Sequence, residues 1–369
     1  MQGKHVAFIV ESSLGHIVPT LGMTSELVRR GYRVTYAVKE SLAPRIAACG
    51  AEAFIYQPLE NKLRLFRELQ QAKGADYLYD LRNAAQLDVT RTLLRDEAED
   101  TFLKLCSLYE ADRPDLIVYD GMNVAGRRLA GQWSVPAIYH SPVLLETGGS
   151  LPEGVPIIAS VPRFFQRNAG KYGDRVHFVG FIPGQRENFF EHWTPTRGVD
   201  KTLLVCPTTG LLPQVDFIRM AVDAFANLAW HVVLSIGDSI APEAIGPLPA
   251  HFEINQRSAN LEILKHSFLF VGQGGQGGTF EALYCGVPSI LIPPSTTHDI
   301  VAARLEELGL GIRLSRCEAN AESLRRCAIQ LSENDSICGR VREIQHSLHQ
   351  NDGAELAADV IGRYAAMAS

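Results

Sequence analysis

Short apolar runs alternate with amphipathic segments along most of the chain. In the first half, apolar runs predict strands at Val6–Val10, Tyr32–Val38, Ala53–Tyr56, Leu116–Tyr119, Pro136–Tyr139 and Val176–Val179. Helical spacing predicts helices from Pro19 to Gly31, over Leu42–Cys49, within residues 60–110 and over Val124–Gln132. This alternation is typical of a parallel sheet with helical crossovers.

The same pattern restarts after a segment with no clear period. Residues 186–200 predict a linker, and strands are expected at Leu203–Cys206, Val232–Ile236, Phe252–Ile254, Ser267–Val271, Ser289–Ile292 and Ile312–Leu314. Helices are expected near residues 215–228, 261–265, 279–285, 318–331, 337–349 and 353–366. The predicted organisation is therefore an α/β chain with two Rossmann-like, doubly wound domains, 1–185 and 201–352. Such sheets bind ligands at the carboxyl ends of their strands, which favours a site in an interdomain cleft.

Composition and charge exclude several classes of protein. The 369 residues are 46% hydrophobic and 21% charged, which is ordinary for a globular protein. A net charge of −6 gives no electrostatic case for a nucleic-acid partner. No apolar run approaches the roughly 20 residues of a membrane span, and the start lacks the apolar core of a signal peptide. Seven scattered cysteines favour reduced thiols and a cytoplasmic protein.

A glycine-rich stretch follows the predicted strand Ser267–Val271. The residues after the glycines have helical spacing, and the predicted helix ends at Gly286 and Pro288. Between strand and helix stand Gly272, Gly274, Gly275, Gly277 and Gly278. Glycine lets the backbone approach a ligand closely, and the first N–H groups of a helix attract an anion. The stretch predicts a phosphate-binding loop, with a tight turn that binds nothing as the alternative. Its spacing matches neither a P-loop nor a dinucleotide fingerprint.

A histidine stands near the end of the first predicted strand. The run Val6–Val10 leads into His16, which is expected at the carboxyl end of the sheet just before a helix. Asp120 follows the predicted strand Leu116–Tyr119 and is expected at the same edge. A histidine oriented by a carboxylate is a general base near neutral pH. The sequence permits this pair, and a histidine that only packs within its loop is the alternative.

Three segments resemble one enzyme family. Residues 15–21 (GHIVPTL) are similar to the amino-terminal loop of nucleotide-sugar-dependent glycosyltransferases of the macrolide and plant secondary-metabolite type. Residues 178–183 (FVGFIP) resemble the hinge entry of that family, and residues 261–293, with the glycine-rich stretch, resemble its donor-binding motif. The resemblance covers nearly the whole chain. It implies two facing Rossmann-like domains of the GT-B type, with residues 353–369 packing back on the first domain.

The resemblance also implies a reaction and a set of roles. The family transfers a sugar, with inversion, from a nucleotide diphosphate to a small-molecule acceptor, often in natural-product biosynthesis. His16 would deprotonate the acceptor, and Asp120 would orient His16. Donor contacts would come from Thr208, Thr209, Gln273, Gly274, Gly275, Gly277, Gly278, Thr279, Glu281, His298 and Asp299, with Glu281 on the ribose hydroxyls. The donor is expected to be a UDP- or dTDP-linked co-substrate. No metal and no other cofactor is expected, and a homodimer is compatible with the sequence.

The donor motif departs from the family pattern at several positions. Gln273 replaces a histidine on the diphosphate, Gly278 replaces a serine, and the acid-glutamine pair that holds sugar hydroxyls falls on Thr297-His298. We expect weaker donor binding, unless His298 or Arg257 supplies a positive charge and Asp299 reaches the sugar.

These departures leave three points open. Thr297 or Asp299 is alternatively a helix cap. A deoxysugar donor would need fewer contacts than a fully hydroxylated one. The alternative function is a glycosyltransferase fold that has lost sugar transfer and binds, or performs acid-base chemistry on, an acidic or phosphorylated metabolite.

Overall fold

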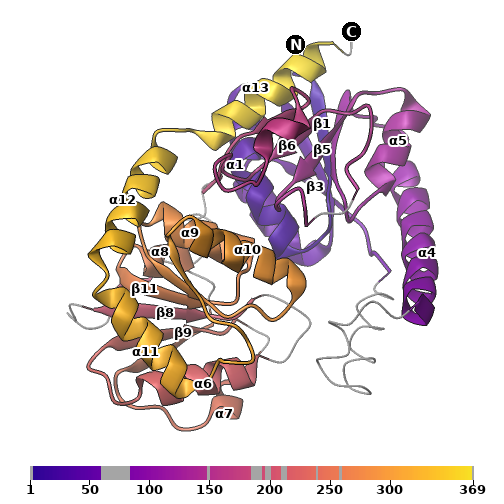
Figure 1. Cartoon of the computed structure of the whole chain (residues 1–369). Coiled ribbons are helices and arrows are strands. Elements are labelled where there is room, and N and C mark those ends of the chain that lie inside the picture. The colour runs from indigo at the N-terminus through magenta and orange to yellow at the C-terminus, as the bar shows by residue number, and fades with distance from the viewer. Residues whose placement is uncertain are drawn as a thin grey trace. The chain divides into compact units, whose positions relative to one another are not determined.

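The chain forms two compact units, which are described separately. The computed structural model describes residues 3–59, 84–147, 150–183, 193–195, 201–208, 214–237, 240–256 and 260–367, without the side chains of 84–95. The first unit comprises Met1–Gln185 and Asn351–Ser369, and the second comprises Arg186–Gln350 (Figure 1). Thr209 and Arg257, both named above, lie outside the described residues.

The first unit is built on a seven-stranded parallel sheet. Its strands are β1 (His5–Ile9), β2 (Arg33–Val38), β3 (Glu52–Ile55), β4 (Leu116–Asp120), β5 (Ala137–Ser141), β6 (Ile157–Ala159) and β7 (Val176–Phe178). The order across the sheet is β3-β2-β1-β4-β5-β6-β7. The strand order reverses between β1 and β4, which is where doubly wound sheets bind ligands. The predicted fold class is therefore confirmed for this unit.

Helices cover both faces of this sheet. The helices are α1 (Leu14–Arg29), α2 (Ala43–Ala48), α4 (Ala84–Tyr109), α5 (Ala125–Trp133) and α13 (Gly353–Ala366). Helices α4 and α5 share a buried apolar cluster with Ile9, Ile117 and Tyr119. Helix α1 lies on the other face, where Thr20 and Thr24 hydrogen-bond to the buried hydroxyl of Tyr36 at 2.7 and 2.6 Å.

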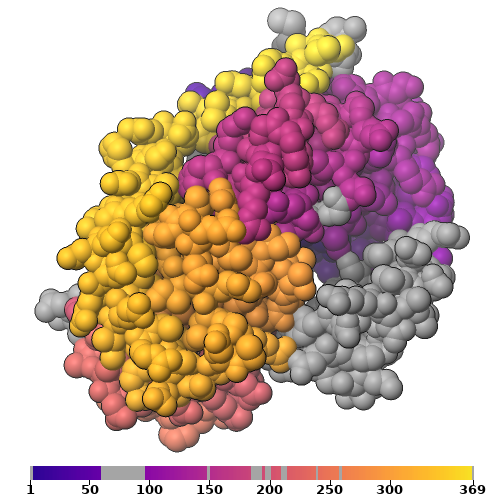
Figure 2. Space-filling model, in the orientation of Figure 1, coloured from indigo at the N-terminus to yellow at the C-terminus, as the bar shows by residue number. Residues whose placement is uncertain are grey.

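The last helix of the chain belongs to the first unit. Helix α13 packs on α1, and Arg30 Nη1 donates to Asp359 Oδ1 at 2.5 Å. At its start, a β-carbon on Gly353 would lie 2.7 Å from the carbonyl oxygen of Val179, so only glycine allows this close approach. In Figure 2 the yellow atoms of α13 lie against the magenta atoms of the same unit.

Helix α1 begins earlier than the sequence predicts. It starts at Leu14, and Pro19 lies inside it. The carbonyl of Ser13 accepts from the N–H groups of His16 and Ile17 at 3.1 and 2.9 Å, which forms the first turn before the proline. The prediction that Pro19 opens the helix is wrong, because proline prefers the first helical turn but does not require it. His16 consequently lies in the first turn of α1 rather than before it.

The second unit contains a six-stranded parallel sheet. Its strands are β8 (Thr202–Cys206), β9 (His231–Ser235), β10 (Phe252–Asn255), β11 (Ser267–Gly272), β12 (Ser289–Leu291) and β13 (Gly311–Arg313). They are arranged in the order β10-β9-β8-β11-β12-β13. The order reverses between β8 and β11, so the unit is a second doubly wound domain, as predicted.

Seven helices of the described residues accompany this second sheet. They are α6 (Val215–Phe225), α7 (Pro242–Ile245), α8 (Asn260–Leu264), α9 (Gln276–Tyr284), α10 (Thr296–Glu307), α11 (Ala321–Ser332) and α12 (Asp335–His349). An apolar cluster joins α6 and α11 to the sheet through Ile218, Val271 and Leu324. Trp193 packs within this unit, where its Nε1 donates to Glu253 Oε1 at 2.7 Å.

Two short elements escaped the sequence analysis. Strand β6 has three residues and lies among Pro152, Pro156 and Pro162, which read as a loop. Helix α7 has four residues, too few to show a helical period. Within the described part of the chain, no helix is long and apolar enough to cross a membrane. A cytoplasmic location stays a prediction.

Candidate active site

His16 and Asp120 meet at the edge of the first sheet. His16 Nδ1 lies 2.7 Å from Asp120 Oδ2. Asp120 is the last residue of β4, and His16 lies on α1, directly after β1. Because β1 and β4 are neighbours and parallel, their carboxyl ends deliver both side chains to the position where the strand order reverses. The His16 side chain is 25% exposed and the Asp120 side chain 1%, so the histidine is the partner that a substrate can reach.

The surroundings of Asp120 keep its carboxylate ionised. Its Oδ2 also accepts from the Glu11 N–H at 2.9 Å, and its Oδ1 accepts from the N–H groups of Met122 and Asn123 at 2.9 and 2.8 Å. Burial acts to raise the pKa of Asp120, but the bond to His16 and the backbone N–H groups outweigh burial and lower the pKa. A fixed carboxylate of this kind selects the tautomer of His16 that carries its proton on Nδ1, which leaves Nε2 as the unprotonated ring nitrogen.

A second histidine lies beside this pair and was not predicted. His140 pairs in register with Asp120 on the neighbouring strand β5, and its side chain is fully buried. Its Nε2 lies 2.8 Å from Ser160 Oγ. Burial lowers the pKa of His140 to about 4, so this ring is neutral at pH 7. The predicted strand ended at Tyr139, and only the register with β4 identifies His140 as a neighbour of Asp120.

The second sheet has its own linked residues at the corresponding edge. Thr208 follows β8 and Gln273 follows β11, the two strands between which the order reverses. The backbone N–H of Thr208 donates to Gln273 Oε1 at 2.9 Å, and Thr208 Oγ1 lies 3.3 Å from His298 Nε2. His298 Nδ1 in turn lies 2.6 Å from Ser295 Oγ. The side chains of Gln273, Thr208 and His298 thus link the loops that carry these three residues at the predicted donor site.

The glycines of the loop have different roles. Gly274 has φ of +78°, and a β-carbon there would lie 2.6 Å from the carbonyl oxygen of His298. A β-carbon on Gly278 would lie 3.3 Å from the ring of Phe270, which is a close approach that a small shift of the ring would relieve. Gly275 is the N-cap of α9, and Gly277 is exposed with open space around its α-carbon. The first N–H groups of α9, up to that of Gly278, have no acceptor within the helix, as in known anion sites.

Thr279 and Glu281 lie further along α9. The hydroxyl and the N–H of Thr279 both donate to the Gly275 carbonyl, at 2.9 and 3.0 Å, and the residue is buried. Both hydrogen-bond donors of Thr279 therefore bond to the first turn of α9 in this structure, and neither faces the loop surface. Glu281 follows Gly277 by four residues, which places both on one face of α9.

His298 and Asp299 occupy the first turns of α10, whose N-cap is Ser295. The alternative that Thr297 or Asp299 caps this helix is therefore wrong. Burial lowers the pKa of His298, which disfavours the positively charged form of this ring. Both oxygens of Asp299 accept from the guanidinium of Arg313, at 2.6 and 2.7 Å. The carboxylate of Asp299 is therefore held in an ion pair with Arg313 in this structure.

Cys206, at the end of β8, is unsuited to be a nucleophile. Burial raises its pKa to about 11, and its sulfur lies 3.3 Å from Asn260 Nδ2. The thiol is therefore protonated at neutral pH.

Comparisons with known proteins agree with this geometry. The profile of the family described as "Erythromycin biosynthesis protein CIII-like, C-terminal domain" matches residues 219–361. NDP-glycosyltransferase YjiC of Bacillus licheniformis is 31% identical and covers 100% of this chain and 99% of its own. Oleandomycin glycosyltransferase of Streptomyces antibioticus is 30% identical over 97% of this chain and 90% of its own.

A solved structure extends the likeness to three dimensions. The calicheamicin glycosyltransferase CalG4 has a TM-score of 0.79 and 26% identity, covering 99% of this chain and 98% of CalG4. The two parallel sheets and this match show the GT-B fold. The rival expectation, a glycosyltransferase fold that has lost sugar transfer, finds no support among these relatives. The chain belongs to the natural-product glycosyltransferases that use nucleotide-sugar donors.

Proposed function

We propose that this glycosyltransferase transfers its sugar with inversion and that His16 is the general base. The observation that carries the proposal is the 2.7 Å contact between His16 Nδ1 and Asp120 Oδ2. With Nδ1 directed at the carboxylate, Nε2 is the ring nitrogen that accepts the proton of the acceptor hydroxyl. Asp120 is a positioning residue that holds the ring and balances the imidazolium formed.

The reaction is a single displacement at the anomeric carbon. The acceptor hydroxyl gives its proton to His16 Nε2 as its oxygen forms a bond to C1 of the sugar. The bond between C1 and the diphosphate oxygen breaks on the opposite face, and the nucleoside diphosphate leaves with that electron pair. No metal or other cofactor takes part in the proposed reaction.

The second unit would bind the donor chiefly with backbone groups. The N–H groups at the start of α9 and the carboxamide NH₂ of Gln273 would contact the diphosphate, because the Gln273 oxygen already accepts from Thr208. Burial lowers the pKa of His298 and so disfavours a positive charge there. Glu281 would accept hydrogen bonds from the ribose hydroxyls of a UDP- or dTDP-linked donor.

The donor sugar is proposed to be a deoxysugar. The residues expected to hold sugar hydroxyls are Thr297 and His298, and the nearby Asp299 is bound to Arg313. A sugar with fewer hydroxyls forms fewer hydrogen bonds to a carboxylate, so its binding free energy depends less on a free one. The acceptor, a small natural product, would bind to the first unit near His16.

The proposal is tested by binding and by product stereochemistry. Calorimetry with UDP, dTDP, GDP and ADP should give micromolar binding of one pyrimidine nucleotide, weakened about tenfold in Glu281→Gln. NMR of the glycoside formed from the matching donor should show inverted anomeric configuration. A retained configuration would contradict the single displacement, and failure of every nucleotide to bind would contradict the donor site.

A further inference from the structure

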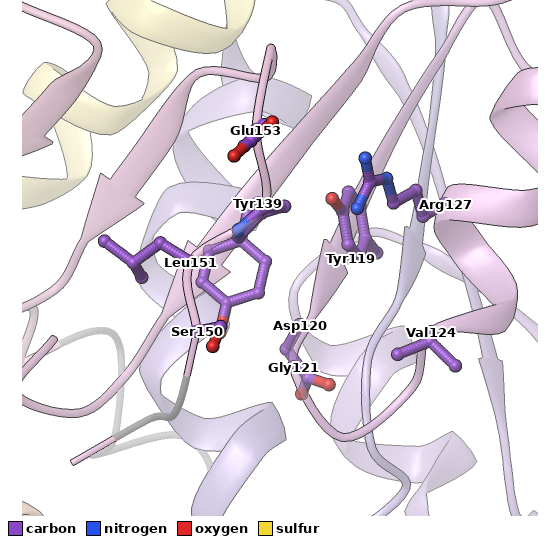
Figure 3. Close-up of a pocket in the computed structure, with 10 residues that line it drawn as sticks. Tyr119, Asp120, Gly121, Val124, Arg127, Tyr139, Ser150, Leu151 and Glu153 are labelled. Carbon is purple, nitrogen blue, oxygen red and sulfur yellow. The ribbon is translucent and has the colours of Figure 1, made fainter. Parts of the chain in front are cut away.

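The second unit contains a histidine whose two ring nitrogens both face hydroxyl groups. His298 Nδ1 lies 2.6 Å from Ser295 Oγ, and His298 Nε2 lies 3.3 Å from Thr208 Oγ1. His16 in the first unit is bonded instead to a carboxylate, that of Asp120, which lines a cavity of about 380 Å³ (Figure 3). Because both nitrogens of His298 are engaged within the protein, its ring is suited to orient a neighbouring group rather than to exchange a proton with a substrate.

The group that His298 can orient is the hydroxyl of Thr208. Thr208 is half-buried, and its backbone N–H is held by Gln273 Oε1 at 2.9 Å, so the residue is fixed from two sides. A β-carbon on Gly275 would lie 3.3 Å from Thr208 Oγ1, which places this hydroxyl beside Gly275, the N-cap of α9. The first N–H groups of a helix favour an anion. The Thr208 hydroxyl therefore lies beside the proposed diphosphate site.

The direction of the hydrogen bond between His298 and Thr208 decides whether this hydroxyl can bind an anion. A hydroxyl has one proton to donate, whereas a neutral imidazole donates from one nitrogen and accepts at the other. If Nε2 of His298 is unprotonated, Thr208 donates its proton to the ring and has none for a phosphate oxygen. If Nε2 carries the hydrogen, Thr208 Oγ1 accepts it, and the hydroxyl proton is available to the diphosphate. The second direction is the one that complements an anion.

The other side of the ring can support this direction. Ser295 Oγ, which faces His298 Nδ1, also lies 3.0 Å from Thr297 Oγ1. Ser295 can therefore accept from the Thr297 hydroxyl and donate its own proton to Nδ1, which leaves the ring hydrogen on Nε2. Thr297 is exposed, so water can complete its bonding. The four side chains then form one directed chain, from Thr297 through Ser295 and His298 to Thr208.

We propose that His298 is a positioning residue of the donor site, whose Nε2–H donates to Thr208 Oγ1 so that the Thr208 hydroxyl donates to the diphosphate of the nucleotide sugar. The inference rests on the proposed function, because it takes the start of α9 as the place where the diphosphate binds. It gives His298 a part that is neither a positive charge nor a contact with the sugar. Negative charge grows on the diphosphate as its bond to the sugar breaks, so the same hydroxyl would also stabilise the leaving group.

Calorimetry with UDP and dTDP tests the proposal through matched variants. Thr208→Val removes the hydroxyl, keeps the backbone N–H, and should weaken binding of the nucleotide about tenfold. His298→Asn places its amide near the position of Nδ1, keeps a partner for Ser295 and loses the one for Thr208, so a loss of about threefold to tenfold is expected. In His298→Gln the amide reaches the position of Nε2, and affinity should return to within about twofold of wild type. His346→Asn, exposed on α12, is the control and should leave affinity unchanged.

A double-mutant cycle separates this role from a merely structural one. In a Thr208→Val background, His298→Asn should weaken nucleotide binding by less than about twofold further, because both changes remove one contact. Thermal unfolding of each variant checks that the second unit is folded. Losses that multiply would mean that His298 acts without Thr208, and this would overturn the proposal. If neither UDP nor dTDP binds the wild-type protein, the proposed donor site fails and the present inference fails with it.

The hydrogen on the His298 ring can also be observed directly. In protein labelled with ¹⁵N-histidine, NMR distinguishes a ring nitrogen that carries hydrogen from one that does not, and the signals of His298 are those missing in His298→Asn. With the bound nucleotide, hydrogen is expected on Nε2 and not on Nδ1. Hydrogen on Nδ1 alone in the nucleotide complex would overturn the proposal, even if the affinities of the variants change as expected.

Discussion

The backbone N–H of Thr208 donates a 2.9 Å hydrogen bond to the side-chain oxygen of Gln273. These residues follow β8 and β11, the central neighbours of the second sheet, just as His16 and Asp120 lie after β1 and at the end of β4 in the first sheet. Each sheet thus uses the place where its strand order reverses to join two loops. The first pair is suited to move a proton, and the second shapes the loop before an anion-binding helix.

Substitutions of Gln273 should separate loop stability from donor binding. Gln273→Ala leaves the Thr208 N–H without its acceptor, and we expect the free energy of unfolding of the second unit to fall by about 1–3 kcal/mol. Gln273→Glu keeps an acceptor oxygen but adds a negative charge beside the diphosphate. It should be nearly as stable as wild type and bind nucleotide at least tenfold more weakly, measured by denaturation and calorimetry. Equal nucleotide affinity in Gln273→Glu would show that residue 273 does not face the diphosphate.

Two glycines of the same loop should respond differently to alanine. Gly274→Ala forces a β-carbon towards the His298 carbonyl and requires positive φ from an alanine, so a loss of about 1–3 kcal/mol is expected. Gly277→Ala has open space, and thermal unfolding should be unchanged or slightly higher. The methyl group of Gly277→Ala should nonetheless weaken nucleotide binding, because it lies on the face of α9 assigned to the donor. Similar unfolding temperatures for both variants would contradict the described loop.

The ion pair between Asp299 and Arg313 should be structural. Both side chains are about one-third exposed, so a double-mutant cycle with Asp299→Asn and Arg313→Gln should give a coupling energy of about 0.5–1 kcal/mol. Donor affinity should stay within about twofold in Asp299→Asn. A tenfold loss of donor-sugar affinity, with nucleotide affinity kept, would instead assign Asp299 to the sugar.

His140 should make the stability of the first unit depend on pH. Burial lowers its folded pKa to about 4, below the unfolded value of about 6.5. Between pH 4 and pH 6.5 the unfolded state binds one more proton than the folded state. The contribution of neutral His140 to the free energy of unfolding is therefore complete above pH 6.5 and is lost as the pH falls towards 4. The free energy of unfolding lost in this way amounts to about 3 kcal/mol.

The matched variant for this test is His140→Gln, which can still bond to Ser160 but does not titrate. Denaturation curves between pH 4 and pH 7 should show a smaller slope for the variant than for wild type. Parallel pH profiles for the two proteins would mean that His140 is not buried in its neutral form.

Most of the fold could be predicted from periodicity, because long apolar strands and amphipathic helices are encoded locally. The pairing of His16 with Asp120 was only permitted by the sequence, since it depends on which strands become neighbours. Strand β6 was missed because three residues between prolines carry no period. The start of α1 was misplaced because Pro19 resembles a helix start, whereas the backbone of Ser13 closes an earlier turn.

The residues that sequence reasoning missed or misjudged depend on contacts far apart in the chain. His140 is a neighbour of Asp120 only through the register of β4 and β5. The ion pair of Asp299 with Arg313, fourteen residues later, is likewise not indicated by any local pattern. The lowered pKa of His298 likewise follows from burial, which no local motif indicates.

The most direct test of the proposed mechanism is the turnover number of His16→Ala with saturating nucleotide sugar and acceptor. Loss of the base should lower turnover by about 10²–10⁴-fold, while the dissociation constant of the nucleotide, bound by the second unit, stays within about twofold of wild type. Turnover equal to that of wild type would contradict the assignment of His16 as the base.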